Sequence, residues 1–369
     1  MNNRILYTVI IIILAILYYL FGKFAFAFAI SYETVTSAIF LSEGIALAFI
    51  LLYGWRVWPG IFIGQMLLGF ATGLNIWSSL FISAGNSAEA LVGLWILSRL
   101  KFNVSVISLR DYLLLIFIIF AVLQPLSSVI GVTSLYLFSD LRGDDILSCL
   151  IYWWMGNSMG QMLLTPMILL AAAILKEGKK HIAGRAVEAL VSMLAIGLVS
   201  LLIFTLWGRS EVLHNVHAFF LILPVVIWLS LKYDITGAVV SSFVISLIAQ
   251  IFTVKGVGPF TGWDIQHNLI SLNVFIISIT LSAGFTGILF YERKVREDKL
   301  RHALDEIKTL QGILPICSSC KKIRNDRGYW EQIESYISKH SDAEFTHSLC
   351  DDCVKKIYGK NYLPNNDTE

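Results

Sequence analysis

Charged residues are scarce in this chain. Asp, Glu, Lys and Arg together make up 15% of its 369 residues, whereas about a quarter of the residues of a soluble protein are charged. Hydrophobic residues make up 56%. The composition therefore predicts a polytopic membrane protein, and the formal net charge of +2 gives no reason to expect a nucleic-acid partner.

The chain also lacks the motifs of the common signalling enzymes. It contains no P-loop, no glycine-rich nucleotide loop and no phosphorylatable histidine box. The polar segment after the last apolar stretch has fewer than eighty residues. We therefore expect no enzymatic activity.

Long apolar stretches follow one another along most of the chain. They lie at about residues 5–29, 35–53, 57–74, 76–97, 111–138, 146–175, 190–207, 216–231, 235–254 and 269–291. Because about twenty apolar residues in a helix cross a bilayer, the pattern predicts an all-α polytopic membrane bundle with about ten transmembrane helices. Two stretches are separated only by Lys232, Tyr233 and Asp234, so eight crossings are the alternative. No small-residue cleavage site follows Met1–Gly22, which we interpret as the first span.

The distribution of Lys and Arg predicts the orientation. With the N-terminus in the cytoplasm, the loops on that side carry Arg56, Arg99, Lys101, Arg110, Lys176, Lys179, Lys180, Arg185, Lys232, Arg293, Lys294 and Arg296. The opposite loops carry Lys23, Arg142, Arg209 and Lys255. Since cytoplasmic loops are enriched in Lys and Arg, we expect a protein of the inner (cell) membrane with both termini in the cytoplasm.

Two acids and several amides lie inside the apolar stretches. The candidate intramembrane ligand site consists of Glu43, Glu89, Asn86, Asn157 and Gln161, with Gln65 and Gln124 nearby in the pattern. A charge at the centre of a membrane helix costs about 2.5–3.5 kcal/mol on insertion scales, so such residues are candidates for function. The acids could share a proton, line a ligand cavity or bind a cation. Alternatively, they pair with the amides and hold the helices together.

Three blocks of sequence carry a family resemblance. They read EGIALAFILLYGWRVWPGIFIGQMLLG, GNSAEALVGLWILSRL and YWWMGNSMGQMLLTPMILL. In order and spacing they resemble the membrane-associated sensor domain of the first class, a MASE-type domain, over about residues 10–295. The resemblance implies an integral membrane sensor, of a kind usually placed ahead of signalling enzymes. Family members often carry Gly-Asp where this chain has Gly156 and Asn157, so one intramembrane acid is replaced here by an amide.

The last apolar stretch continues into a charged segment without a proline or a turn cluster. Apolar residues recur there at spacings of three and four, at positions Leu300, Ala303, Ile307, Leu310 and Leu314. This pattern is typical of the seam of a parallel coiled coil and favours a homodimer. The alternative is a solvated single helix. In either case we expect a helical link from the membrane to the C-terminal segment.

Four of the five cysteines lie near the C-terminus in two C-x2-C pairs, Cys317 with Cys320 and Cys350 with Cys353. Two such pairs can supply four thiolates to a tetrahedral zinc ion, and in the reducing cytosol zinc is favoured over a disulfide framework. The segment resembles treble-clef zinc modules and a short C-terminal module of bacterial sensor proteins. We expect a structural zinc ion, with thiol redox chemistry as the alternative.

Together these patterns predict four parts: a membrane sensor domain at 1–291, a helical linker at 292–314, a zinc-binding module at 315–360 and a disordered tail at 361–369. The expected function is a bacterial membrane sensor that relays an unknown stimulus to a cytoplasmic signalling protein. Its other partners would be membrane lipid and an unidentified ligand. The alternatives are a small-molecule or ion transporter with a regulatory zinc tail, and a thiol redox sensor.

Overall fold

The computed structural model describes most of the chain. The described residues are 3–32, 35–37, 39–105, 108–139, 141, 143–177, 194–205, 222–262, 264–306, 314–325, 328–341 and 343–359. They belong to two units, Met1–Lys294 and Val295–Glu369. The predicted disordered tail at 361–369 and the seam residues Ile307 and Leu310 lie outside the described residues.

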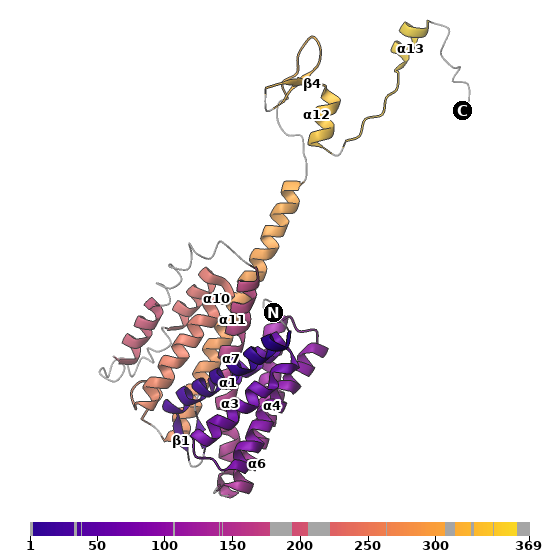
Figure 1. The fold of residues 1–369 in the computed structure, drawn as a ribbon. Coiled ribbons are helices and arrows are strands. Elements are labelled where there is room, and N and C mark those ends of the chain that lie inside the picture. The colour runs from indigo at the N-terminus through magenta and orange to yellow at the C-terminus, as the bar shows by residue number, and fades with distance from the viewer. Residues whose placement is uncertain are drawn as a thin grey trace, which may run out of the picture. The chain divides into compact units, whose positions relative to one another are not determined.

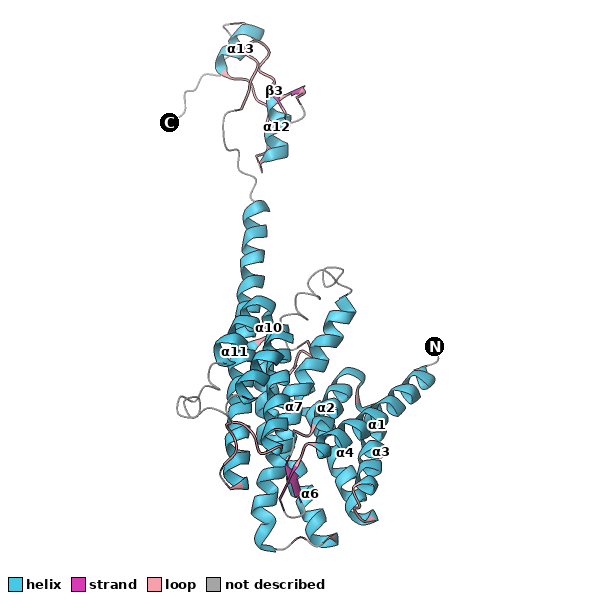
Figure 2. Ribbon diagram, turned by 90° about the vertical axis from the view of Figure 1, so that its left-hand side faces the viewer, coloured by secondary structure: helices cyan, strands magenta, loops and turns pink. Residues whose placement is uncertain are grey.

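The first unit is a bundle of helices (Figures 1 and 2). Its main helices are α1 (Asn3–Ala27), α2 (Leu41–Tyr53), α3 (Trp58–Ala71), α4 (Ile76–Arg99), α5 (Leu109–Ile118), α6 (Gln124–Phe138), α7 (Ile146–Glu177), α10 (Ile222–Val254) and α11 (Ile265–Glu306). A further apolar helix covers Leu194–Thr205. Strands β1 (Ile30–Tyr32) and β2 (Val35–Ser37) pair antiparallel.

Six helical segments of the described chain are long and apolar enough to cross a membrane. They are Arg4–Ala27, Ile76–Arg99, Leu109–Phe138, Gly143–Lys176, Ile222–Val254 and Ile265–Leu304. The prediction of an all-α, multi-pass membrane bundle is therefore confirmed. The count of ten or eight crossings stays a prediction.

Helices α2 and α3 are shorter than the apolar stretches that predicted them. They have 13 and 14 residues, or about 20 Å each, against a hydrocarbon core of about 30 Å. Nine of the residues of α2 are buried, and the amide of Phe40 at its start donates to the Gly156 carbonyl at 3.1 Å. A helix that ends inside a membrane protein needs such partners, because lipid supplies none.

Helices α5 and α6 are joined without a loop by a five-residue π-helical segment, Ile119–Leu123. Pro125 lies just after this segment and has no amide hydrogen to continue the regular helical bonding. The Gln124 amide donates to the Ile119 carbonyl, which leaves the Phe120 carbonyl to another donor. The indole of Trp154 in α7 donates to that carbonyl at 2.9 Å. This π-helical segment sets the direction in which α6 presents Gln124.

The chain turns back inside α10. Tyr233 and Asp234 have non-helical backbone angles, and Asp234 has φ 55°. A Cβ on Gly237 would lie 2.2 Å from the Leu229 carbonyl oxygen, although eight residues of a straight helix span about 12 Å. The two halves of α10 correspond to the two neighbouring stretches of the sequence pattern, and the absence of a Cβ at Gly237 permits the close approach.

The second unit contains a short hairpin and two short helices. Strands β3 (Ile323–Arg324) and β4 (Trp330–Glu331) pair antiparallel, and Ile316 bridges to Ile323. Helices α12 (Ile333–His340) and α13 (Asp351–Tyr358) follow. Asp326 and Arg327, between the two strands, lie outside the described residues.

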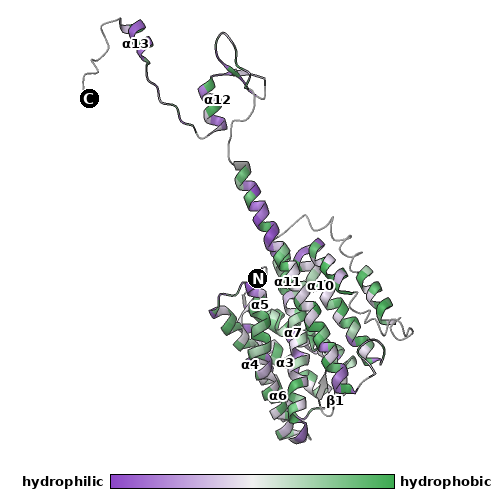
Figure 3. Cartoon of the chain, turned by 180° about the vertical axis from the view of Figure 1, so that it is seen from behind, coloured by the Kyte–Doolittle hydropathy of each residue, from purple (hydrophilic) through white to green (hydrophobic). Residues whose placement is uncertain are grey.

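Hydropathy changes along α11 (Figure 3). Residues such as Leu272, Ile276 and Ile279 are buried in the first unit, whereas the segment after Glu292 is rich in charged residues. Leu300 and Leu304 are 62% and 59% exposed in the single chain. The helix therefore presents an apolar face within the bundle and a mainly polar surface near its C-terminal end.

Candidate functional site

Polar side chains from five helices meet inside the first unit. They are Tyr18 from α1, Glu43 from α2, Asn86 and Glu89 from α4, Gln124 and Ser127 from α6, and Asn157 and Gln161 from α7; we call this set the polar network. None of its members is more than 6% exposed. On α4 and α6 the pairs are three apart, and on α7 they are four apart, so each helix presents both of its polar residues on one face.

Glycines in α2 and α7 allow these helices to pack closely, which brings their polar residues together in the network. A Cβ on Gly160 would lie 2.0 Å from the Phe40 carbonyl oxygen, and one on Gly44 would lie 2.5 Å from the Gly160 carbonyl oxygen. The hydroxyl of Thr165 in α7 donates to the Gly44 carbonyl at 3.1 Å. Small residues with polar ties between backbones are a common way to pack helices in membranes.

Glu43 accepts two hydrogen bonds on one carboxyl oxygen. The hydroxyl of Tyr18 donates to its Oε1, and the amide of Asn86 donates to the same oxygen at 2.7 Å. Asn86 also donates to the Tyr18 hydroxyl oxygen at 3.0 Å. These three side chains join α1, α2 and α4 through hydrogen bonds that no single helix could make.

Glu89 has a matching but separate set of partners. Gln124 donates to its Oε1 at 2.8 Å, and Gln161 donates to the same atom at 2.7 Å. Each acid is therefore bonded by amide groups from other helices. This geometry agrees with the alternative in which the acids pair with amides and hold the helices together, and the intramembrane ligand site stays a prediction.

Ser127 links the two sides of the network. Its hydroxyl donates to the side-chain amide oxygen of Asn86 at 3.2 Å, and it accepts from the Trp153 indole at 3.2 Å and from the side-chain amide of Asn157 at 3.4 Å. Ser127 and Gln124 are neighbours on α6, so one helix contacts the partners of both acids.

Each acid keeps one oxygen without a donor. Among the described residues, Oε2 of Glu43 and Oε2 of Glu89 are buried and have no hydrogen-bond partner, and the same holds for the amide oxygens of Gln65, Gln124 and Gln161. Unsatisfied buried polar atoms are uncommon in native structures. The network therefore retains unused acceptors inside the membrane bundle.

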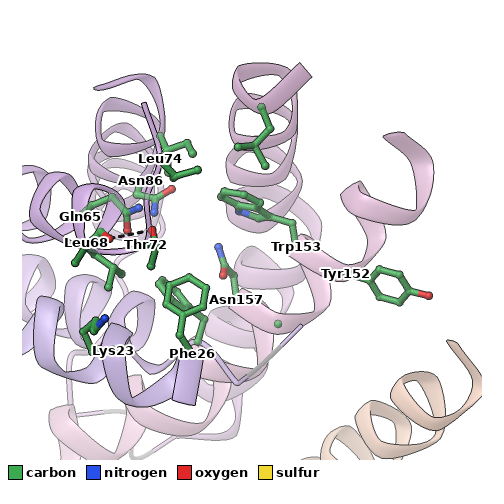
Figure 4. A pocket seen from close by; sticks show the side chains of 15 residues that line it. Lys23, Phe26, Gln65, Leu68, Thr72, Leu74, Asn86, Tyr152, Trp153 and Asn157 are labelled. Carbon is green, nitrogen blue, oxygen red and sulfur yellow. Dashed lines mark hydrogen bonds between the residues drawn. The ribbon is translucent and has the colours of Figure 1, made fainter. Parts of the chain in front are cut away.

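A cavity of about 430 Å³ lies beside the network (Figure 4). Asn86, Trp153 and Asn157 line it and also belong to or contact the network, while Gln65 lines it from α3. Lys23 and Phe26 line it from the C-terminal part of α1. The volume falls within the range of about 300–1,000 Å³ typical of small-molecule sites.

The family model MASE1 matches residues 10–294. The chain belongs to the MASE1 family. MASE1 domains are membrane sensors, so the first unit is a membrane sensor domain, and the family resemblance seen in the sequence is confirmed for this part. No match was found among curated proteins or among solved structures.

Sequence reasoning missed several residues of this MASE1 domain. Tyr18 and Ser127 gave no signal, because a tyrosine or serine in a membrane helix is not unusual. Trp153 was not predicted to join the network, and its indole donates to Ser127, while the Trp154 indole donates to the Phe120 carbonyl. The contacts of Gly160 show that this residue serves the packing of α7 against the start of α2.

The cysteine pairs lie beyond the MASE1 match. Backbone amides of Cys320 and Ser319 lower the pKa of the Cys317 thiol. The backbone amide of Cys353, at the start of α13, lowers the pKa of the Cys350 thiol, and the Cys350 side chain raises the pKa of Cys353. Each pair thus forms a tight turn whose amides favour a thiolate, which suits a metal ligand.

The two pairs are not brought together in this structure. Within the described ranges, no group of three or more His, Cys, Asp or Glu side chains is placed to hold a metal ion. The donor chemistry and the turns fit zinc, but the four-thiolate site stays a prediction.

Proposed function

We propose that this protein is a non-enzymatic sensor of the inner membrane. A change in the polar network of the MASE1 domain shifts α11, and the cysteine module passes the shift to a cytoplasmic signalling protein. The observation that carries this proposal is α11 itself, a single helix from Ile265 to Glu306. A continuous helix can transmit a displacement without an intervening hinge.

Helix α5 contacts α11 and is continuous with α6, which carries part of the polar network. The Tyr112 hydroxyl in α5 donates to the Thr280 carbonyl in α11 at 3.0 Å, and a Cβ on Gly284 would lie 2.3 Å from that hydroxyl oxygen. The same helical segment continues through the π-helical residues to Gln124, which binds Glu89. A change in the pairing of Glu89 would therefore act on the segment that contacts α11.

Two polar contacts hold α11 near the end of the domain. The amide of Leu109 donates to Glu292 at 3.0 Å, and Lys294 lies 3.6 Å from Asp234. The first contact caps the start of α5, and the second joins α11 to the turn inside α10. These contacts support a path by which movements of α5 and α10 reach α11.

We also propose ten crossings with both termini in the cytoplasm, and two contacts at helix ends are consistent with this topology. At the predicted inner side, Arg56 lies over the Tyr7 ring at 5.4 Å. At the predicted outer side, Gln250 near the end of α10 donates to the Phe28 carbonyl after α1 at 2.9 Å. The ten crossings include the helix Leu194–Thr205 and the two halves of α10 as separate passes. Accessibility labelling of single cysteines at Lys23 and Arg56 would test this topology.

We further propose that the cysteine module binds one zinc ion through Cys317, Cys320, Cys350 and Cys353. When bound, zinc would supply a structural cross-link between the two turns. The lowered pKa of Cys317 and of Cys350 agrees with this role. Metal analysis under reducing and oxidising conditions would separate it from thiol redox sensing, in which each pair forms a disulfide.

The relay can be tested in the full chain with a photo-crosslinking residue at Ile357, which is 60% exposed on α13. We expect a crosslink to a soluble signalling protein whose yield changes in Tyr112→Phe. The matched control is Tyr136→Phe, because Tyr136 is half-exposed on α6. Leu304→Pro breaks the helix and should abolish the effect of Tyr112→Phe. Equal yields in both tyrosine variants, or an unchanged effect in Leu304→Pro, would contradict the relay.

One observation favours a second function. The unpartnered carboxyl oxygens of Glu43 and Glu89 suit a protein that passes a proton or a cation, and a transporter with a regulatory tail is the second candidate. Reconstituted flux that is lost in Glu89→Gln would support it, and absence of flux in proteoliposomes would exclude it.

A further inference from the structure

The cavity of the MASE1 domain lies at one end of the helices. It is lined by residues near the C-terminal ends of α1, α3 and α6 and from the N-terminal parts of α4 and α7. By the proposed topology this is the outer side of the membrane. Its volume is about 430 Å³. It is large enough for a small organic molecule.

The described residues of the cavity wall carry charge of only one sign. Among the described residues that line it, Lys23 is the only charged one. Lys23 is exposed and, in the described part of the chain, forms no ion pair. Figure 4 shows it on α1 beside Phe26, across the cavity from Asn157 and Trp153. A cation at the rim of a partly apolar cavity attracts an anionic group.

Two amide side chains, Gln65 and Asn157, lie in the cavity wall, and one of them has an oxygen without a protein donor in the described part of the chain. Gln65 is 6% exposed, its amide oxygen has no donor among the described residues, and it lies against the cavity (Figure 4). The side-chain nitrogen of Asn157 donates to Ser127, and this side chain also faces the cavity (Figure 4). A buried amide that lacks a partner costs free energy, so a ligand that supplies a donor would bind there.

The rest of the wall is apolar and aromatic. Phe26, Phe40 and Leu68 line the side near α1 and α3, and Leu135 lines the side near α6. Glu43 is not one of the lining residues, whereas Asn86, which donates to its carboxyl, is. Among the described residues of the wall there is thus no carboxylate to neutralise a bound cation, whereas there is apolar surface for a hydrocarbon or aromatic body.

We propose that this cavity binds an organic anion with an apolar body, its carboxylate, phosphate or sulfonate near Lys23 and its hydrogen-bonding group near Gln65. The ligand would be either a soluble compound on the outer side or the head group of an anionic lipid. This inference rests on the proposed sensor function and names its ligand class. Binding would act on Asn86, Trp153 and Asn157, all of which are bonded to Ser127 or to Glu43.

The test uses the full chain in nanodiscs of neutral phosphatidylcholine. Three fluorinated anions that each carry a phenol hydroxyl as the donor for Gln65 serve as probes, 3-fluoro-5-hydroxybenzoate, 3-fluoro-5-hydroxyphenyl phosphate and 3-fluoro-5-hydroxybenzenesulfonate, with the neutral 3-fluoro-5-hydroxybenzamide as comparison. Fluorine NMR line broadening measures binding. The variants are Lys23→Gln, Gln65→Leu and the matched control Lys255→Gln, because Lys255 is also exposed and also lies on the predicted outer side.

We expect saturable binding of at least one anion, weaker binding of the benzamide, and about tenfold weaker anion binding in Lys23→Gln, corresponding to about 1.4 kcal/mol. Gln65→Leu should weaken binding about fivefold, and Lys255→Gln should leave it unchanged. If added phosphatidylglycerol displaces the probe, the site binds a lipid head group. If the probe stays bound, the site binds a soluble anion.

Three outcomes would overturn the proposal: no saturable binding of any anion, equal binding of anion and benzamide, or equal losses in Lys23→Gln and Lys255→Gln. Each of these would leave the relay through α11 to be decided by the crosslinking experiment, so failure of the ligand site and failure of the sensor function are distinguishable.

Discussion

Asn86 is the residue whose replacement tests the polar network most directly. Its side chain makes three hydrogen bonds to other helices, to Glu43 at 2.7 Å, to the Tyr18 hydroxyl at 3.0 Å and from Ser127 at 3.2 Å. Leucine has a similar size but makes none of them. In membranes a hydrogen bond between helices contributes about 0.6 kcal/mol on average and at most about 1.7.

Loss of three such bonds should lower the free energy of unfolding by about 2 kcal/mol in Asn86→Leu. Because one of the bonds is to a carboxyl oxygen and is stronger, we expect a loss of about 2–3 kcal/mol. The matched control is Asn273→Leu. Asn273 is buried to a similar extent in α11, but its side chain bonds, within the described part of the chain, only to the Leu269 carbonyl of its own helix at 2.9 Å. Its replacement should cost less than about 1 kcal/mol.

The free energy of unfolding can be measured by titrating the full chain with dodecyl sulfate in mixed micelles and following its helical circular dichroism. A double-mutant cycle with Ser127→Ala adds a second test, because residues that share a hydrogen bond give non-additive losses. Equal losses for Asn86→Leu and Asn273→Leu, together with additivity in the cycle, would refute the view that the network joins the helices.

Three further predictions concern other parts of the chain. Gly160→Ala should destabilise the MASE1 domain by about 1–3 kcal/mol in the same assay, because its Cβ would lie 2.0 Å from a backbone oxygen. Cys350→Ser should remove the zinc found by metal analysis of the purified full chain, and Cys149→Ser should not. Lys339 donates to Glu331 at 2.8 Å and holds the pKa of that carboxyl below its ordinary value. Lys339→Met should therefore raise this pKa in an NMR titration of labelled glutamate.

Each of these has its own check. Gly197→Ala is the control for helix propensity, since the nearest atom to its Cβ is a Val244 methyl at 3.9 Å; an equal loss there would contradict the packing argument. Zinc that persists in Cys350→Ser would remove this cysteine from the site. Because the pKa of Glu331 is lowered, the contribution of its ion pair is present at neutral pH and is lost as the pH falls through that lowered pKa. An unchanged titration in Lys339→Met would contradict the assigned cause.

Much of the fold follows from hydropathy alone. A long run of apolar residues has no stable conformation in lipid other than a helix, because every backbone group must be bonded within the segment. The sequence therefore determined the membrane class, the family and the approximate positions of most helices. It did not give the length of α2, because the start of that helix depends on Gly156 of α7, whose carbonyl accepts from the Phe40 amide.

The acids and amides were identifiable as candidates because a polar residue inside an apolar stretch is costly. Their partners were not identifiable. Membrane helices are apolar on nearly all sides, so their periodicity does not reveal which face packs against which neighbour. Only the structure shows that Asn86 binds Glu43 whereas Gln124 and Gln161 bind Glu89.

The sequence by itself determined that this is a multi-pass MASE1 protein with buried acids, an extended last helix and two cysteine pairs, since each of these depends on local composition or spacing. The tertiary structure decided the polar network, its link through Ser127, and the cavity between Lys23 and Gln65. These features arise where five helices meet, and the meeting is set by close glycine contacts and cross-helix hydrogen bonds between residues far apart in the chain.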